Sequence, residues 1–323
     1  MRPLAALLAL AVLPLLATFA PRSLAVQTPL PKQARIWFEP LPLAPDEPGR
    51  RRVGRLVYLG GWALRSNDRR FGGMSAVHVE GGEVTGVSDA GSHFRFRLPA
   101  GGRNVAALEV GALSDRVGGK RARDAEAMAI AGDQLWVAFE RTNSVERFDR
   151  TTWRMEASAA PPSMRSWRAN TGAEALVRLK DGRFLVFSEG RSGTDRPTQA
   201  VLFAGDPAVE GMAAVRLRYA PPAGFRATDA AELADGRLLI LNRRFSVLDG
   251  FSAKIVLADP SGLAEGVVLK GEEIAHLEPP LTVDNMEGIS IGRQGGRTIV
   301  WLASDDNFID FQRSLLLKFA LAE

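Results

Sequence analysis

Alternating apolar and polar positions predict a β-hairpin over residues 170–190. One strand opens at Glu174, Asp181 and Gly182 form the turn, and the second strand ends at Glu189. Because the two strands are antiparallel, both acids are expected at the same end of the hairpin. The layout recurs in three further hairpins and one weaker copy, whose end residues are Glu126 and Glu140, Glu232 and Arg243, Glu287 and Asp305, and Ser75 and Asp89.

The recurrence of this hairpin favours an all-β fold, the β-propeller. The opening residues Ser75, Glu126, Glu174, Glu232 and Glu287 are 51, 48, 58 and 55 residues apart. Each interval divides into four short strands separated by Gly, Asp and Pro, and no amphipathic helix is predicted. Many short strands at a regular period are typical of a propeller rather than of a sandwich.

The two ends of the chain are expected to close the ring. The last repeat contains only three predicted strands, while residues 55–65 form a strand without a repeat partner. Pairing of residues 55–65 beside residues 315–321 completes the last blade and removes an open sheet edge. This predicts five four-stranded blades over residues 53–323, with a sixth, degenerate blade as the alternative.

The N-terminal residues predict export. Residues 1–25 combine Arg2, a long apolar run and a small-residue exit, which is typical of a secretory signal peptide cleaved near Val26. An uncleaved anchor is the alternative. Residues 26–52 are proline-rich and are expected to be a tether with at most one short strand around residues 36–38. We therefore expect a periplasmic or secreted monomer that is not inserted in a membrane after removal of the signal.

The amino-acid composition limits which kinds of catalytic and binding site this chain can contain. The chain contains no cysteine, which excludes disulfides, thiolate metal sites and a cysteine nucleophile. Its 41 basic and 37 acidic residues give a net charge of +4, which suits an anionic small molecule as ligand. The sequence has no basic cluster with interleaved aromatics, so nucleic-acid binding is not expected. It also has no glycine motif of a nucleotide site, so a nucleotide cofactor is not expected. The histidines lack metal-ligand spacing, so zinc is not expected.

A propeller brings the repeated acids to one mouth of its central channel. The first strand of each blade lines the channel, and the antiparallel second strand returns to the same face. Facing carboxylates repel one another and are expected to bind Ca²⁺ or Mg²⁺, which prefer oxygen ligands. The alternative is that they pair with arginines or backbone N–H groups of neighbouring blades and only hold the blades together. Flanking these acids are Asp124, Asn170, Asp229, Asp284 and Asn285 before the first strands, and Arg141, Arg191, Arg244, Asp306 and Asn307 after the second strands.

Residues 288–292 match the G-x-S-x-G pattern of a serine nucleophile, with Ser290 at its centre. That pattern requires a strand-turn-helix context and a later histidine, whereas this stretch alternates like a strand and no histidine follows it. We interpret Ser290 as a structural residue.

Five sets of motifs follow one another along the chain: FGGMSAV with VSDAG, DAEAMAI with WVAFER, NTGAEAL with VFSEG, LLILNRRFS, and NMEGISI with LASDDNF. Together, from Gly72 to the C-terminus, they resemble the phytase-like domain family, also described as "esterase-like activity of phytase". The resemblance implies an exported propeller whose acidic, calcium-binding face hydrolyses phosphate esters or other esters. A non-catalytic exported propeller that binds a ligand or an envelope partner through the same face is the alternative.

The resemblance also implies roles for individual residues. Glu126, Glu174, Glu232 and Glu287 would hold the metal and act in catalysis, with Arg141, Arg243 or Arg244 steadying the anionic substrate. Residues expected to contribute to substrate binding are Asp89, Glu140, Glu189, Asn170, Asn285, Arg244, Asp305 and Asn307.

Overall fold

The computed structural model describes residues 30–113, 124–190 and 196–322. Met1–Leu30 and Pro31–Glu323 are separate units, and the following paragraphs concern the second. The predicted signal peptide with its cleavage near Val26 lies outside the described residues, as does Arg191. The described residues form strands β1 to β23 and no helix. None of them therefore lies in a helix that could cross a membrane.

The strands form antiparallel groups that follow one another along the chain. The first group is β4 (Met74–Glu80), β5 (Glu83–Ser88), β6 (Ser92–Arg97) and β7 (Val105–Ala112). The second is β8 (Ala125–Ala131), β9 (Gln134–Phe139), β10 (Ser144–Asp149) and β11 (Met155–Ala159). The third is β12 (Ala173–Arg178), β13 (Phe184–Ser188), β14 (Thr198–Phe203) and β15 (Ala214–Tyr219), with the short parallel strand β19 (Val268–Leu269) beside β15.

The fourth and fifth groups complete the unit. The fourth is β16 (Arg226–Glu232), β17 (Leu238–Ser246), β18 (Gly250–Ala258) and β20 (Gly271–Leu277). The fifth is β21 (Met286–Gln294), β22 (Arg297–Ser304), β23 (Leu315–Leu321) and β3 (Leu56–Ser66), with β2 (Arg52–Val53) beside β3.

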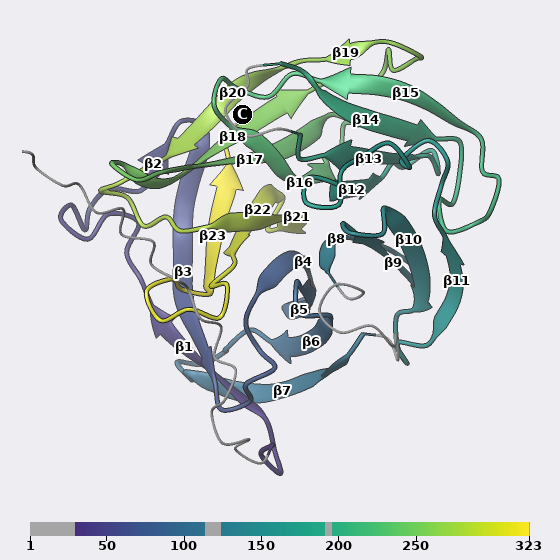
Figure 1. Cartoon of the computed structure of the whole chain (residues 1–323). Helices are drawn as coiled ribbons and strands as arrows, with labels where there is room; N and C mark the ends of the chain where they lie inside the picture. The colour runs from purple at the N-terminus through teal and green to yellow at the C-terminus, as the bar shows by residue number, and fades with distance from the viewer. Residues whose placement is uncertain (1–29, 114–123, 191–195, 323) are drawn as a thin grey trace, which may run out of the picture. The chain divides into compact units, whose positions relative to one another are not determined.

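The first strands of the groups surround a central channel. β4 contacts β8 and β21, β12 contacts β8 and β16, and β16 contacts β21, so these strands follow one another around a ring. Figure 1 looks along the channel, with β7, β11 and β15 at the periphery. This arrangement of radial antiparallel sheets is a β-propeller, as the repeat predicted.

Closure of the ring by the N-terminal strand is confirmed. β3 pairs with β23, from Ala63 opposite Leu315 to Leu56 opposite Leu321. A second link was not predicted: β1 (Arg35–Pro40) pairs with both β3 and β7 and so joins the fifth and first groups into one ten-stranded sheet.

The segment around β1 is part of the domain rather than a free tether. Ile36, Phe38 and Leu43 are each at most 2% exposed. The interpretation of residues 26–52 as a tether is therefore wrong from β1 onward, although the short strand expected around residues 36–38 is present as β1. Proline-rich composition indicated a linker, but these apolar side chains fill the core between groups.

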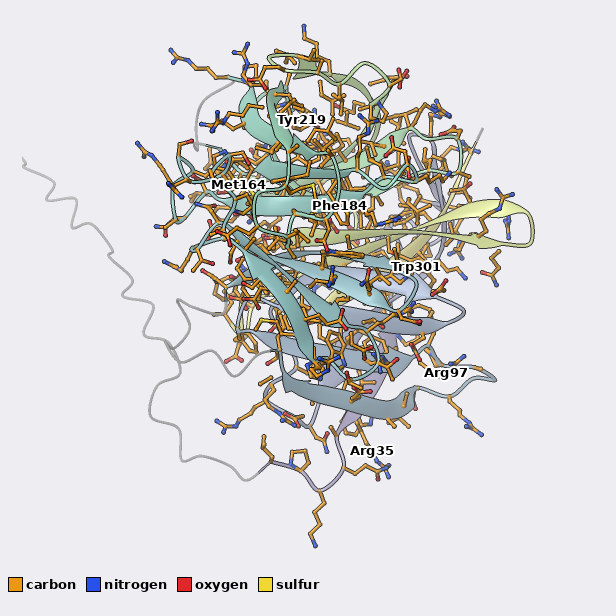
Figure 2. The ribbon with its side chains drawn as sticks, turned by 90° about the vertical axis from the view of Figure 1, so that its right-hand side faces the viewer. Arg35, Arg97, Met164, Phe184, Tyr219 and Trp301 are labelled. Carbon is orange, nitrogen blue, oxygen red and sulfur yellow. The ribbon has the colours of Figure 1, made fainter. Side chains whose placement is uncertain are left out.

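Apolar side chains pack between neighbouring sheets. Phe187 and Tyr219 meet edge to face at 5.5 Å, and Trp136 meets Phe184 at 4.9 Å. The Tyr219 hydroxyl donates a hydrogen bond to Asn242 Oδ1 of the next group at 3.0 Å, which satisfies its buried polar end. Figure 2 shows Phe184 and Tyr219 within the unit and Arg97 pointing outward.

We expect the closing seam to be part of the cooperative fold. Leu317 of β23 is fully buried and pairs with Gly61 of β3. Leu317→Ala should lower the free energy of unfolding by about 2–5 kcal/mol because it leaves a cavity. Urea unfolding measures this, with Leu248→Ala as the control, since Leu248 is 94% exposed. Equal, small effects of the two variants would show that the seam opens before the rest unfolds.

Candidate functional site

A β-bulge near the start of each channel strand shapes one mouth of the channel. The register shifts by one residue in all these strands, and a bulge re-aims the side chain that it carries. The bulged residues are Ser75, Glu126, Glu174, Thr228 and Glu287. Two positions further, the corresponding residues are apolar and line a cavity of about 170 Å³ in the channel: Val77, Met128, Leu176, Ala230 and Ile289.

The prediction that Glu232 lies at the channel mouth with Glu126, Glu174 and Glu287 is wrong. Thr228 occupies the bulge of β16, while Glu232 is the last residue of that strand, four residues further along the channel. Glu232 there accepts a hydrogen bond from Lys180 N at 2.8 Å. The alternation of the strand was interpreted correctly, so Glu232 does face the channel, but it lies about 13 Å from the mouth at 3.3 Å per residue.

The spacing to the turn could have revealed this difference. Glu174 precedes Asp181 by seven residues, and Thr228 precedes Asp235 by the same seven. Aligning the repeats on the turns rather than on the glutamates therefore makes Thr228 the counterpart of Glu174. The same alignment also makes Arg226, which we had not singled out, equivalent to Asp124 and Asn285.

The second strands return to the same mouth, as their direction predicted. Arg243 pairs with Arg226 at the start of β16. The acids that directly follow the partners of the first residues of the other channel strands are Asp89, Glu140, Glu189 and Asp305. These four acids are at most 9% exposed. Buried acids from several groups thus converge where the sequence placed them.

Burial and mutual repulsion shift these carboxyl groups toward the protonated form. Burial raises the pKa of Glu140 to about 7, and nearby Asp124 adds to the shift. Burial also raises the pKa of Glu287 to about 7, although Arg243 opposes that shift. The pKa values of Glu126, Glu174 and Asp305 are raised well above the usual range, first by burial and then by neighbouring acids. Some of these groups therefore hold protons near neutral pH.

Arginines at the mouth are already engaged with particular acids. Arg243 Nη2 lies 3.2 Å from Glu287 Oε1 and 3.5 Å from Glu189 Oε1. Arg226 pairs with Glu189 at 2.6 Å. Arg141 pairs with Asp124 at 2.5 Å and donates to Asn170 Oδ1 at 3.1 Å. The positive charge is thus concentrated at Glu189 and Glu287 on one side of the mouth and at Asp124 on another.

Several of these contacts join neighbouring groups of strands. Gly172 N donates to Glu140 Oε1 at 3.4 Å, and Gly73 N donates to Asp306 Oδ1 at 2.8 Å. Arg243 donates to Asn285 Oδ1 at 2.6 Å. Each of these pairs connects the end of one second strand to the start of the next channel strand. Part of the acidic face therefore has the structural role that the sequence had left open.

Glu126 differs from the other acids. Its carboxylate is half-buried and has no hydrogen bond or ion pair with the described residues. One oxygen each of Asp124, Glu126 and Glu140 lie within 4.8 Å of one another. A set of carboxylate oxygens without His or Cys fits Ca²⁺ or Mg²⁺ and does not fit zinc.

The remaining predicted residues lie around this centre. Arg244 stacks on Phe225 at 4.9 Å and shares a cavity of about 210 Å³ with Arg226, Arg243, Glu189 and Phe245. The exposed Asn307 donates its side-chain amide to Gln312, while its backbone N–H donates to Asp305 Oδ1 at 2.6 Å. Asn170 is exposed, and its side-chain oxygen accepts the hydrogen bond from Arg141.

Two flanking acids, Asp229 and Asp284, are bound to backbone rather than open to the mouth. Asp229 accepts hydrogen bonds from Ala230 N and Ile289 N at 2.8 Å. Asp284 accepts from Asn285 N at 3.0 Å and from Arg313 N at 3.2 Å.

Ser290 has the structural role expected of it. It lies within β21 opposite Trp301, and its hydroxyl accepts a hydrogen bond from Val79 N of β4 at 2.9 Å. It therefore connects two channel strands and is not presented on a turn.

The chain is similar to two solved structures and matches one family model. The structure is similar to a glutaminyl cyclase from Myxococcus xanthus (TM-score 0.47, 11% identity), over 83% of this chain and 97% of that one. It is also similar to an α-L-arabinofuranosidase from Clostridium thermocellum (TM-score 0.45, 12% identity), over 73% of this chain and 83% of that one. No curated protein matches the sequence. The family model "Phytase-like: Esterase-like activity of phytase" matches residues 69–308, which is most of the chain, and the chain therefore belongs to this phytase-like family.

Proposed function

We propose that the acidic mouth is the active site of a metal-dependent hydrolase that acts on phosphate esters or other esters. The observation that carries the proposal is Glu126, whose carboxylate has no partner among the described residues and lies within 4.8 Å of Asp124 and Glu140 oxygens. Like charges at this distance repel, and a divalent cation relieves that repulsion. The family match supports ester hydrolysis as the reaction.

The residues that would hold the ion are Asp124, Glu126 and Glu140, with Glu174 and Glu287 nearby. A divalent cation bound there supplies positive charge that stabilises the negative charge developing on the ester group. The metal set differs from the one expected from the sequence, since Glu232 is at the other end of the channel and Asp124 and Glu140 take part instead.

Protein groups at the mouth suit acid–base chemistry at neutral pH. Burial raises the pKa of Glu140 to about 7, so this carboxyl can accept a proton from water and later return one to a leaving group. Its hydrogen bond with Glu174 allows the two groups to share a proton.

The arginines beside the mouth suit an anionic substrate. Arg226, Arg243 and Arg244 line one cavity with a single carboxylate, Glu189. Guanidinium groups bind phosphate and carboxylate through paired hydrogen bonds. The substrate that we propose is therefore a small anionic ester, its charged group toward these arginines and its ester bond toward Glu140.

A binding protein without catalytic activity is the second candidate. It is favoured by the contacts of Glu140 and Glu189 with Gly172 and Arg226, because residues that connect blades need no chemistry to explain them. Either function fits the further proposal that the protein is exported to the periplasm or beyond as a monomer.

The first test is calcium affinity. Glu126→Gln removes one charge but keeps the shape, so it should weaken calcium binding at least tenfold while leaving the calcium-free protein as stable as the wild type. Isothermal titration calorimetry and thermal melts measure the two effects. Glu232→Gln is the matched control and should bind calcium normally. Reduced stability of Glu126→Gln with unchanged calcium affinity would instead assign Glu126 a purely structural role.

The second test is turnover. Glu140→Gln should lower hydrolysis about 10²–10⁴-fold, because it removes the proton acceptor. A panel of phosphomonoesters and carboxyl esters, assayed with calcium and with a chelator, measures this against the wild type. Calcium binding by the wild type without hydrolysis of any ester in the panel would favour the binding protein.

The third test is the pH dependence of stability without calcium. Burial raises the pKa values of Glu140 and Glu287 to about 7 in the folded protein, from an ordinary value of 4.5. Between these pH values the folded state binds more protons than the unfolded state, so stability falls as pH rises from about 4.5 to 7. Calcium should restore stability at pH 7 and above. A melting temperature that rises steadily over this range without calcium would contradict the assignment.

A further inference from the structure

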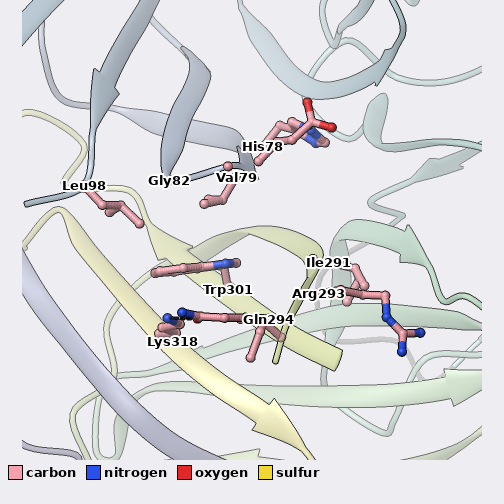
Figure 3. Close-up of a pocket in the computed structure, with 13 residues that line it drawn as sticks. His78, Val79, Gly82, Leu98, Ile291, Arg293, Gln294, Trp301 and Lys318 are labelled. Atoms are coloured by element: carbon pink, nitrogen blue, oxygen red, sulfur yellow. Dashed lines mark hydrogen bonds and ion pairs between the residues drawn. The ribbon is translucent and has the colours of Figure 1, made fainter. Parts of the chain in front are cut away.

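A further cavity lies toward the other end of the channel, away from the acidic mouth. Its volume is about 630 Å³, within the range of small-molecule sites. It opens between the end of β4 and the second half of β21, and the β22 and β23 strands contribute Trp301 and Lys318 (Figure 3). Val79, Ile299 and Trp301 are each at most 5% exposed and give the cavity an apolar base.

The cavity exists because β4 and β21 diverge. Near the mouth the strands are tightly packed: a Cβ added at Gly288 would meet Val77 Cγ2 at 3.2 Å. Further along, a Cβ at Gly292 would meet only Val79 O, at 3.6 Å. β4 then ends at Glu80, while β21 continues to Gln294. The missing side chain of Gly292 therefore leaves room that a larger residue would fill.

Hydrogen-bond donors without a carboxylate partner face this cavity. Lys318 Nζ donates to Gln294 Oε1 at 2.6 Å and lies 5.1 Å from the centre of the Trp301 ring, but no carboxylate of the described residues pairs with it. The Trp301 indole N–H has no acceptor among those residues either. The one acid of the lining, Glu80, is paired with Arg150 at 3.1 Å. Burial, with Arg297 nearby, lowers the pKa of Lys318, and a bound anion would reverse that shift.

We propose that this cavity binds a small organic acid with an aromatic body. The acid group faces Lys318, with the Trp301 indole N–H as a second donor, and the aromatic body packs on Trp301, Val79 and Leu98. Figure 3 shows Lys318 on one side of the Trp301 ring and Val79 and Leu98 on the other, and all four residues line the same cavity. The site is separate from the acidic mouth and does not depend on the function proposed for it.

The probe that tests the proposal is 2-naphthoate, titrated calorimetrically into the full-length protein in the presence of a chelator. The neutral analogue 2-naphthalenemethanol should bind about tenfold more weakly, because it cannot form the charge-assisted contact with Lys318. Lys318→Met should reduce naphthoate affinity to that of the alcohol. Lys270→Met removes the same charge at an exposed position outside the cavity and should change nothing.

Two further variants locate the site. Gly292→Leu should abolish binding of both compounds by filling the cavity, with thermal melts confirming that it folds. Glu126→Gln should leave naphthoate binding unchanged, since Glu126 is at the opposite mouth. The proposal is overturned if naphthoate and the alcohol bind equally, if Lys318→Met binds naphthoate like the wild type, or if the folded wild type binds neither at millimolar concentration.

Discussion

Repulsion between buried carboxylates is the constraint from which the arrangement of the channel mouth follows. The channel strands bring Glu126, Glu174 and Glu287 to one level, and the second strands add acids around them. Beneath them lie Val77, Met128, Leu176 and their counterparts, which provide no compensating dipoles. Such a group is stable only where acids hold protons, pair with cations or bind an ion.

All three solutions can be recognised, and they are distributed unevenly. Arg243 lies between Glu189 and Glu287 and neutralises one side of the mouth. Glu140 and Glu174 share a hydrogen bond that requires a proton. Among the described residues, Glu126 has neither a cation nor a hydrogen-bond partner, so its side of the mouth is where an added cation would stabilise the acids most. The five bulge positions also differ in charge: β4 and β16 carry Ser75 and Thr228, whereas the other three channel strands carry a glutamate there.

The ring that forces the acids together depends on its closure by the N-terminal segment. β3 completes the last group, and Arg55 N donates to Ile274 O at 2.7 Å, which attaches the same segment to the fourth group. Thr282 N also donates to Leu43 O at 2.7 Å. Since no strand edge is left open at this seam, the channel strands cannot separate to relieve the repulsion at the mouth.

The alternation of residues along single strands predicted much of this structure, because the side of the strand on which a residue lies is set by its immediate neighbours in the sequence. Parity and strand direction placed Glu126, Glu140 and Glu287 at one mouth and paired β3 with β23. The features that the sequence did not predict are the position of each residue along the channel axis and the contacts between segments far apart in the sequence. The bulges cannot be recognised from alternation, because one extra residue leaves the flanking pattern intact. The pairing of β1 with β7 joins residues about 70 positions apart in the sequence, and no local pattern specifies such a contact.

Glu126 and Glu232 show why residue type alone could not assign the site. Both face the channel, and both are half-buried glutamates on channel strands. Glu232 accepts a hydrogen bond from Lys180 N and lies near the positive charges of Lys180 and Arg178. At an effective dielectric constant of 20, a cation about 13 Å away stabilises a carboxylate by only about 1 kcal/mol, whereas one at 4 Å contributes about 4 kcal/mol. The basic groups around Glu232 therefore cannot compensate Glu126 from the far end of the channel, and the difference between the two positions is set by their immediate neighbours.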